Sequence, residues 1–185
     1  RRLGKPIILA ICKGLLNADQ VLFIIYSFTS NNNIAMKEIY PSIQQFFSLY
    51  AARMQNALTG AQINPKEQAD CFTGCFAGAS PQGVICAQND DAFLQQIEKG
   101  YSFYRSIGTQ SMQLLSVEIT ELNELHYSVK TSWEARIRKK DQTEVVIPFV
   151  NFYFLQALNN TFKIFAFVTD DEQKAYADKG IEPYL

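Results

Sequence analysis

Apolar residues recur at three- and four-residue spacing along residues 37–59, which is the pattern of an amphipathic helix. Gly60 follows this stretch and provides a natural C-terminal stop. Asn64 and Pro65 then offer an N-cap and a proline at the first helical position. A second helix is therefore predicted to begin there and to end near residues 74–78.

The next two elements predicted are a short strand and a third helix. Residues 83–88, Gly-Val-Ile-Cys-Ala-Gln, read as a possible strand because they are short, apolar and bounded by turn residues. Asp90 and Asp91 begin a helix, and Gly108 closes it. The apolar stripe of this helix contains Phe93, Leu94, Ile97, Tyr101 and Tyr104.

After Gly108 the period of the apolar residues changes from 3.6 to 2, which indicates strands. Residues 112–121, 126–139, 144–157 and 161–169 form four such segments joined by short turns, as in an antiparallel meander. The predicted fold class is α+β, with three N-terminal helices packed on a curved antiparallel four-stranded meander and a possible short extra strand.

The turn at Asp141-Gln142 decides which faces of the central hairpin are buried. If this turn has two residues, Lys140 pairs with Thr143 and Trp133 faces Val150. A loop of four residues would keep the same parity. The predicted buried face contains Val129, Thr131, Trp133, Ala135 and Ile137, facing Phe154, Phe152, Val150, Pro148 and Val146.

The opposite face of the sheet is mixed, and its apolar part is larger than a soluble monomer usually exposes. We therefore expect a homodimer that buries this face. Cover by the C-terminal tail or by the first 35 residues is the alternative. The residues assigned to the dimer face are Ile147, Phe149, Asn151, Tyr153, Leu155, Ile164 and Ala166.

The composition is that of a single ordinary domain, since 185 residues with 48% hydrophobic content suffice for one substantial core. A formal net charge of −1 gives no electrostatic footprint for nucleic acid. The basic stretch at residues 136–140 leads into a turn and is interpreted as a solvated strand end. Aromatic residues make up 13% of the chain, which suits a heavily packed sheet or an aromatic-lined cavity.

The cysteines offer no metal site. Cys12, Cys71, Cys75 and Cys86 form no Cys-X-X-Cys pair and no zinc spacing with the single histidine, His126. No metal and no cofactor are expected. Cys71 and Cys75 are interpreted as small buried hydrophobes, with a redox pair as the alternative. Reduced thiols and the lack of a clear export signal favour a cytoplasmic protein without membrane contact.

Residues 1–35 differ from the rest of the chain. They are basic at the start and apolar in two short pieces, which match neither a spanning helix nor a signal peptide. The first methionine, Met36, stands directly before the first helical pattern. We expect residues 1–35 to be an extension, either a poorly ordered segment or non-native upstream sequence. A degenerate membrane or export signal is the alternative. The domain then comprises residues 36–185.

The order of elements, the stretch YSFYRSIGTQ and the hairpin VKTSWEARIRKKDQTEVVIPFVNFYFLQ resemble small bacterial SnoaL-like proteins of the nuclear transport factor 2-like superfamily, also called cystatin-like. The resemblance covers residues 37–180 and implies an α+β cone that encloses a cavity. Transferred by position, the cavity would bind a small apolar or aromatic molecule. It would be bordered by Tyr50, Met54, Tyr101, Tyr104, Tyr127, Thr131, Trp133, Val150 and Phe152. Alternatively, these residues fill the cone as ordinary core.

Proton-transfer enzymes of this superfamily place an Asp or His in the cavity, and these cavity residues include neither. We therefore prefer the hypothesis of a non-catalytic module that binds a small apolar molecule in the cone and dimerises through the outer sheet face. The alternative is an isomerase, cyclase or dehydratase of the SnoaL-like kind, whose weak candidates are Tyr50, Tyr104 and Asp70. It requires a buried carboxylate or histidine that points into a cavity. A protein-interaction scaffold with a filled cone is a third hypothesis.

Overall fold

The computed structural model describes residues 39–60, 64–159 and 161–181. The chain divides into two compact units, Arg1–Ser42 and Ile43–Leu185, and the second holds every strand described below. The predicted extension at residues 1–35 lies outside the described residues, and so does Cys12.

Four segments of the described residues are helical. The longest covers residues 39–58 and buries Ile43 and Phe47 on one face. The side chain of Asn64 accepts a hydrogen bond from the backbone N–H of Lys66, as an N-cap does. The shorter helices are α3 (Pro65–Ala69), α4 (Asp91–Ser106) and α5 (Glu172–Ala177).

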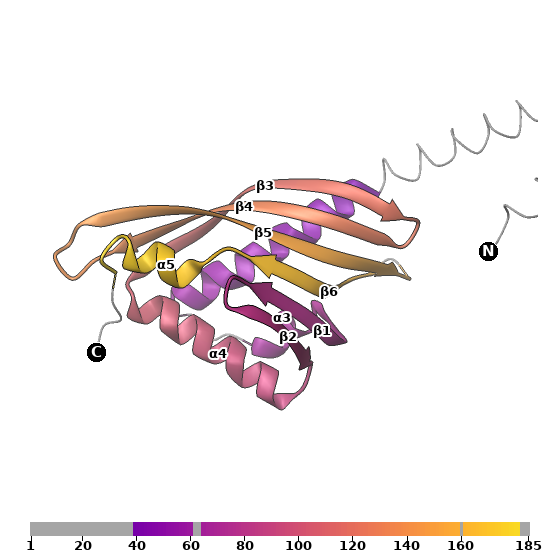
Figure 1. The fold of residues 1–185 in the computed structure, drawn as a ribbon, viewed down its shortest axis with the longest axis horizontal. Helices are drawn as coiled ribbons and strands as arrows, with labels where there is room; N and C mark the ends of the chain where they lie inside the picture. Colours follow the sequence, from indigo (N-terminus) through magenta and orange to yellow (C-terminus); the bar gives the residue numbers. More distant parts are fainter. Residues whose placement is uncertain (1–38, 61–63, 160, 182–185) are drawn as a thin grey trace, which may run out of the picture. The chain divides into compact units, whose positions relative to one another are not determined.

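The strands form one sheet with the order β2-β1-β6-β5-β4-β3 (Figure 1). Strand β1 runs parallel to β6, whereas every other neighbouring pair is antiparallel. The predicted fold, three N-terminal helices on a four-stranded meander, is therefore wrong. The sheet is mixed, with six strands: β1 (Phe72–Ser80), β2 (Gly83–Gln88), β3 (Thr109–Asn123), β4 (His126–Arg138), β5 (Glu144–Leu158) and β6 (Thr161–Thr169).

Strand β1 replaces the second half of the predicted second helix. The start signal at Asn64 is used, but α3 ends at Ala69 because the chain then joins the sheet between β2 and β6. Glycine costs about 1 kcal/mol in a helix interior relative to alanine. In the strand, glycine at position 78 leaves room for the Phe167 ring, because a Cβ built on Gly78 would lie 2.6 Å from Cζ of Phe167. Tertiary pairing thus overrides the helical pattern here.

The turn between β4 and β5 has three residues rather than two. Lys139 donates its N–H to the carbonyl of Thr143 at 2.9 Å, and Gln142 donates to the carbonyl of Lys139 at 3.0 Å. Gln142 takes a φ of 68°, as the last residue of a three-residue hairpin loop commonly does. Trp133 consequently pairs with Phe149 and not with Val150, the predicted partner. The predicted register is wrong by one residue, which exchanges the two faces of β5.

The exchange of faces overturns the placement of the dimer-face residues. Ile147, Tyr153 and Leu155 are buried inside the unit, and so is Ile164. A bulge in β6 lies between the pairs Phe154–Ala166 and Leu155–Ile164, which leaves Ala166 beside Phe154 on the other face. The outward side of β5 is formed by Val146, Pro148, Val150, Phe152 and Phe154. The homodimer itself stays a prediction.

Candidate functional site

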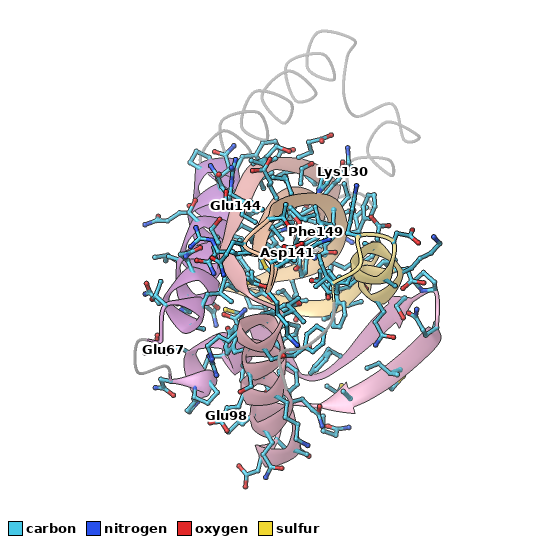
Figure 2. The ribbon with its side chains drawn as sticks, turned by 90° about the vertical axis from the view of Figure 1, so that its left-hand side faces the viewer. Glu67, Glu98, Lys130, Asp141, Glu144 and Phe149 are labelled. Carbon is cyan, nitrogen blue, oxygen red and sulfur yellow. The ribbon has the colours of Figure 1, made fainter. Side chains whose placement is uncertain are left out.

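A cavity of about 160 Å³ lies within the unit Ile43–Leu185, between the sheet and the helices. In Figure 2, Phe149, one of the lining residues, projects near the middle of the view, whereas Glu67 and Glu98 lie toward its edges. The lining residues are Tyr50, Met54, Phe72, Tyr104, Met112, Trp133, Phe149, Asn151, Tyr153, Phe167, Thr169 and Glu172.

One wall of the cavity is a stacked aromatic pair on neighbouring strands. The rings of Trp133 and Phe149 have centroids 6.1 Å apart and an interplanar angle of 4°. The indole N–H of Trp133 donates to Oγ1 of Thr131 at 2.8 Å, and that hydroxyl donates to the carbonyl of Asn151 at 3.1 Å. Because its polar atom is bonded inside the protein, Trp133 presents a flat apolar surface to the cavity.

Hydroxyl and amide groups from the long helix and β5 meet at the cavity. The Tyr50 and Tyr153 rings have centroids 6.0 Å apart, and Nδ2 of Asn151 donates to the Tyr153 hydroxyl at 3.3 Å. Burial raises the pKa of the Tyr50 and Tyr153 hydroxyls above the ordinary value. Both tyrosines therefore stay protonated at neutral pH and can donate hydrogen bonds.

Glu172 is the one carboxyl group among the lining residues, and it belongs to the first turn of α5. The Tyr104 hydroxyl, from α4, lies 3.1 Å from each of its carboxylate oxygens. Burial raises the pKa of Glu172, while hydrogen bonds from Tyr104 and Tyr176 act in the opposite direction. A carboxyl group with a raised pKa in an apolar cavity can hold or release a proton closer to neutral pH.

The position of Glu172 depends on the anchoring of α5. Tyr176 and Ile181 are buried in an apolar cluster with Ile107, Ile137 and Ile147. The Asp171 side chain caps the start of α5 by accepting a hydrogen bond from the N–H of Lys174 at 2.9 Å. The apolar cluster thus fixes the helix, and the helix directs its first residue toward the cavity.

The structure places only some of the predicted cavity residues at the cavity. Tyr50, Met54, Tyr104 and Trp133 line the cavity. Tyr101, Tyr127 and Thr131 are buried but are not among its lining residues. Val150 and Phe152 lie on the opposite face of β5 as a result of the register, so their assignment to the cavity is wrong. Phe149, Asn151 and Tyr153 line the cavity in their place.

The other polar candidates lie away from the cavity. Asp70 is exposed at the end of α3, where its ion pair with Lys66 at 2.7 Å lowers the pKa of the carboxyl group. Nδ1 of His126 lies 2.9 Å from Oδ1 of Asn123 at the start of β4. Asp70 and His126 are both absent from the lining residues.

The sequence reasoning missed Glu172. Residues 170–172 are acidic and follow the last strand, and the tail that they begin reads as a short helix or turn. A usable signal was the spacing of Glu172 and Tyr176, because residues four apart share one face of a helix and Tyr176 is apolar enough to be buried. The partner Tyr104 is distant in sequence and could not be inferred from local pattern.

The described residues contain neither a cluster of metal ligands nor a membrane-spanning helix. No group of three or more His, Cys, Asp or Glu side chains in that part of the chain could hold a metal ion. No helix among the same residues is both long enough and apolar enough to cross a membrane.

Residues 37–172 match the model of the family described as NTF2-like protein (DUF6841). An NTF2-like protein with a cystatin-like fold from Novosphingobium aromaticivorans is similar at a TM-score of 0.60 and 9% identity, over 81% of this chain and 92% of its own. No curated protein sequence matches the chain.

Two other solved structures share the fold at low identity. A candidate scytalone dehydratase from Novosphingobium aromaticivorans has a TM-score of 0.55 and 19% identity, over 76% of this chain and 86% of its own. A protein from Catenulispora acidiphila, solved in complex with S-DNPA, has a TM-score of 0.53 and 16% identity, over 76% of this chain and 98% of its own.

Proposed function

Because the chain belongs to the NTF2-like protein family (DUF6841), we propose that its cavity binds a small, flat and largely apolar ligand. The observation that carries this proposal is an aromatic-walled cavity with a single carboxyl group, Glu172, among its lining residues. Apolar walls with a few well-placed polar groups are typical of small-molecule sites.

The volume of the cavity limits the size of the ligand. It measures about 160 Å³. An apolar cavity of about 150 Å³ holds one benzene molecule, whereas sites for drug-sized ligands occupy roughly 300–1,000 Å³. The preferred ligand therefore has one ring and few substituents, and it would lie against the flat Trp133–Phe149 pair.

A second candidate function, proton transfer of the isomerase or dehydratase type, is favoured by Glu172. In its ionised form this carboxylate can take a proton from a bound ligand, and in its neutral form it can return one. The hydroxyls of Tyr50 and Tyr153 and the amide of Asn151 are donors suited to a ligand oxygen that gains negative charge. The candidate scytalone dehydratase and the S-DNPA complex support small-molecule chemistry on this fold by likeness alone.

The binding proposal can be tested through Trp133, the single tryptophan of the chain. One-ring probes such as phenol and 2-cyclohexenone should change its fluorescence in a saturable way, because they would contact the indole directly. Two-ring probes such as 2-naphthol should not saturate. Unchanged Trp133 emission with all one-ring probes, checked by calorimetry, would remove the binding proposal.

The proton-transfer candidate is tested separately with 2-cyclohexenone in D₂O. Proton NMR should show deuterium entering the ketone faster with the protein than without it. Glu172→Gln should abolish the exchange while keeping the fluorescence response, because the amide fills the same space but cannot accept the proton. Asp70→Asn, an exposed carboxyl outside the cavity, is the matched control. Saturable binding without exchange would leave ligand binding as the function.

A further inference from the structure

Strand β2, residues Gly83–Gln88, forms one edge of the sheet and pairs only with β1 among the described residues (Figure 1). The side chains of Val84 and Ile85 are 74% and 61% exposed, although they point to opposite faces of the strand. Both faces of β2 are therefore open to solvent. Val84 and Ile85 are also the two most exposed large apolar side chains in the described part of the chain.

The hydrogen bonds between β1 and β2 show which backbone groups of β2 are unused. Asn89 donates its N–H to the carbonyl of Gly74 at 2.9 Å, next to the pair Cys75–Gln88. In an antiparallel ladder, hydrogen-bonded pairs alternate with pairs whose backbone groups point away from each other. By this alternation the N–H and C=O groups of Val84, Cys86 and Gln88 point toward the open edge.

Within the described residues, this edge lacks the usual protection against pairing. Native edge strands are commonly protected by lysine, proline, inward charges or a bulge. Residues Gly83–Gln88 contain no charge and no proline, and their pairing with β1 is continuous from Cys75–Gln88 to Ser80–Gly83. An uncharged, apolar and regular edge is suited to the addition of another strand.

We infer that β2 pairs antiparallel with β2 of a second copy of this chain, about a two-fold axis at Cys86. This register places the outward groups of Cys86 opposite those of the second Cys86, and the outward groups of Val84 opposite those of Gln88. Each facing pair can exchange two hydrogen bonds. A register shifted by two residues toward either end of β2 would lose one facing pair.

Charge favours a second copy in this orientation. The uncharged stretch does not repel its own copy, and the acidic residues Asp90 and Asp91 follow it at one end only. In the antiparallel register these two acids lie opposite Gln82 and Pro81 of the second copy, so the acids of the two chains stand at opposite ends. A parallel arrangement would place like charges side by side. The interface is short, so the association should be weak and dependent on concentration.

Cys86 provides a direct test because it is exposed and free. Facing residues of a hydrogen-bonded antiparallel pair have Cα atoms about 5.5 Å apart, within the range of about 4.4–6.8 Å found for disulfides. Diamide takes two electrons and two protons from two thiols, forming a disulfide and the corresponding hydrazine. Oxidation of the full chain carrying Cys12→Ser should give a covalent dimer whose linked peptides join Cys86 to Cys86.

The exposed Cys75, on β1, supplies the matched control. Cys75→Ser should keep the covalent dimer, and Cys86→Ser should abolish it. Equal cross-linking through Cys75 and Cys86 would indicate random collision and overturn the inference. So would the absence of a Cys86–Cys86 link at concentrations where the chain associates.

Association without oxidation gives an independent test by sedimentation over a concentration series. Cys86→Pro removes an N–H that points to the open edge and is not used by β1. It should therefore abolish the association through β2 while the melting temperature stays nearly constant. Cys86→Lys should do the same by adding charge to the edge, and Cys75→Lys should not. If Cys86→Pro lowers the melting temperature, the comparison of Cys86→Lys with Cys75→Lys decides the result. A monomer at all concentrations, or association that Cys86→Lys leaves unchanged, overturns the inference.

Discussion

The hydroxyl of Tyr104 lies 3.1 Å from both carboxylate oxygens of Glu172, although the two residues belong to different helices and are 68 positions apart in the sequence. This bond stabilises the charged carboxylate and so limits the rise of the Glu172 pKa that burial causes. Tyr104→Phe should therefore raise the pKa of Glu172 further.

Carbon-13 NMR of the labelled side-chain carboxyl group can follow this pKa. The matched control is Tyr101→Phe, which changes a buried tyrosine of the same helix that is not a cavity residue. A lower pKa of Glu172 in Tyr104→Phe would show that the Tyr104 hydroxyl does not donate to the carboxylate.

The raised pKa of Glu172 also predicts a pH dependence of stability. Between the ordinary value of 4.5 and the raised folded value, the folded state binds more protons than the unfolded state. The free energy of unfolding therefore falls as the pH rises through this interval, and the contribution is complete below 4.5. Glu172→Gln stays neutral, so its stability relative to the wild type should increase as the pH rises toward neutrality.

Urea unfolding at a series of pH values measures this difference. Asp70→Asn is the control, because the pKa of Asp70 is lowered from 3.8 and its titration lies below the interval. Parallel stability profiles for Glu172→Gln and the wild type would contradict a buried carboxyl group with a raised pKa.

Trp133 is both the largest fully buried side chain and part of the cavity wall. Trp133→Ala should cost about 3–5 kcal/mol of unfolding free energy, because a large aromatic ring leaves a void in a packed region. Thr131→Val keeps the shape but leaves the indole N–H without its acceptor, at a cost of about 1–3 kcal/mol. Denaturant unfolding followed by circular dichroism measures both, and near-normal stability of Trp133→Ala would contradict its burial.

The close approach of Gly78 and Phe167 predicts an effect on both stability and binding. A Cβ at Gly78 would lie 2.6 Å from the Phe167 ring, which lines the cavity. Gly78→Ala should push the ring toward the cavity, cost about 1–3 kcal/mol by overpacking, and weaken the binding of one-ring probes. Gly74→Ala on the same strand is the control, since nothing lies within 4 Å of its added Cβ. Equal effects of the two substitutions would exclude the clash as the cause.

Periodicity predicted the elements better than it predicted their contacts. Residues Asp91–Ser106 form the expected helix, and residues 83–88 form the expected short strand. The strand at Phe72–Ser80 was missed because its pairing with β6 is parallel and joins segments about half the chain apart. Local signals at Asn64 were correct about the start of a helix, but they contain no information on the sheet that ends it.

The cavity was predicted only in part for a similar reason. Of the residues assigned to the cavity, Tyr50, Met54, Tyr104 and Trp133 line it, whereas Val150 and Phe152 lie on the outward side of β5. These errors all come from one extra residue in the turn before β5, since a shift by one residue exchanges the faces of a strand. The spacing of Glu172 and Tyr176 marks one face of α5, but the burial of that face depends on docking against Ile107, Ile137 and Ile147, which are distant in sequence.

Gln142 occupies the position that sets this register. Its φ of 68° is in the left-handed region, where a residue with a Cβ is roughly 1–2 kcal/mol less favourable than in the right-handed region. Glycine avoids this cost, although it also adds freedom to the unfolded chain. Gln142→Gly should therefore raise the free energy of unfolding by about 0.5–1 kcal/mol.

Gln142→Val should lower the free energy of unfolding, because a β-branched residue is strained at positive φ. The neighbouring substitution Lys140→Gly controls for loop flexibility alone. A loss of stability in Gln142→Gly would show that the turn does not use the left-handed conformation, and the three-residue loop that brings Phe149 beside the cavity would then be wrong.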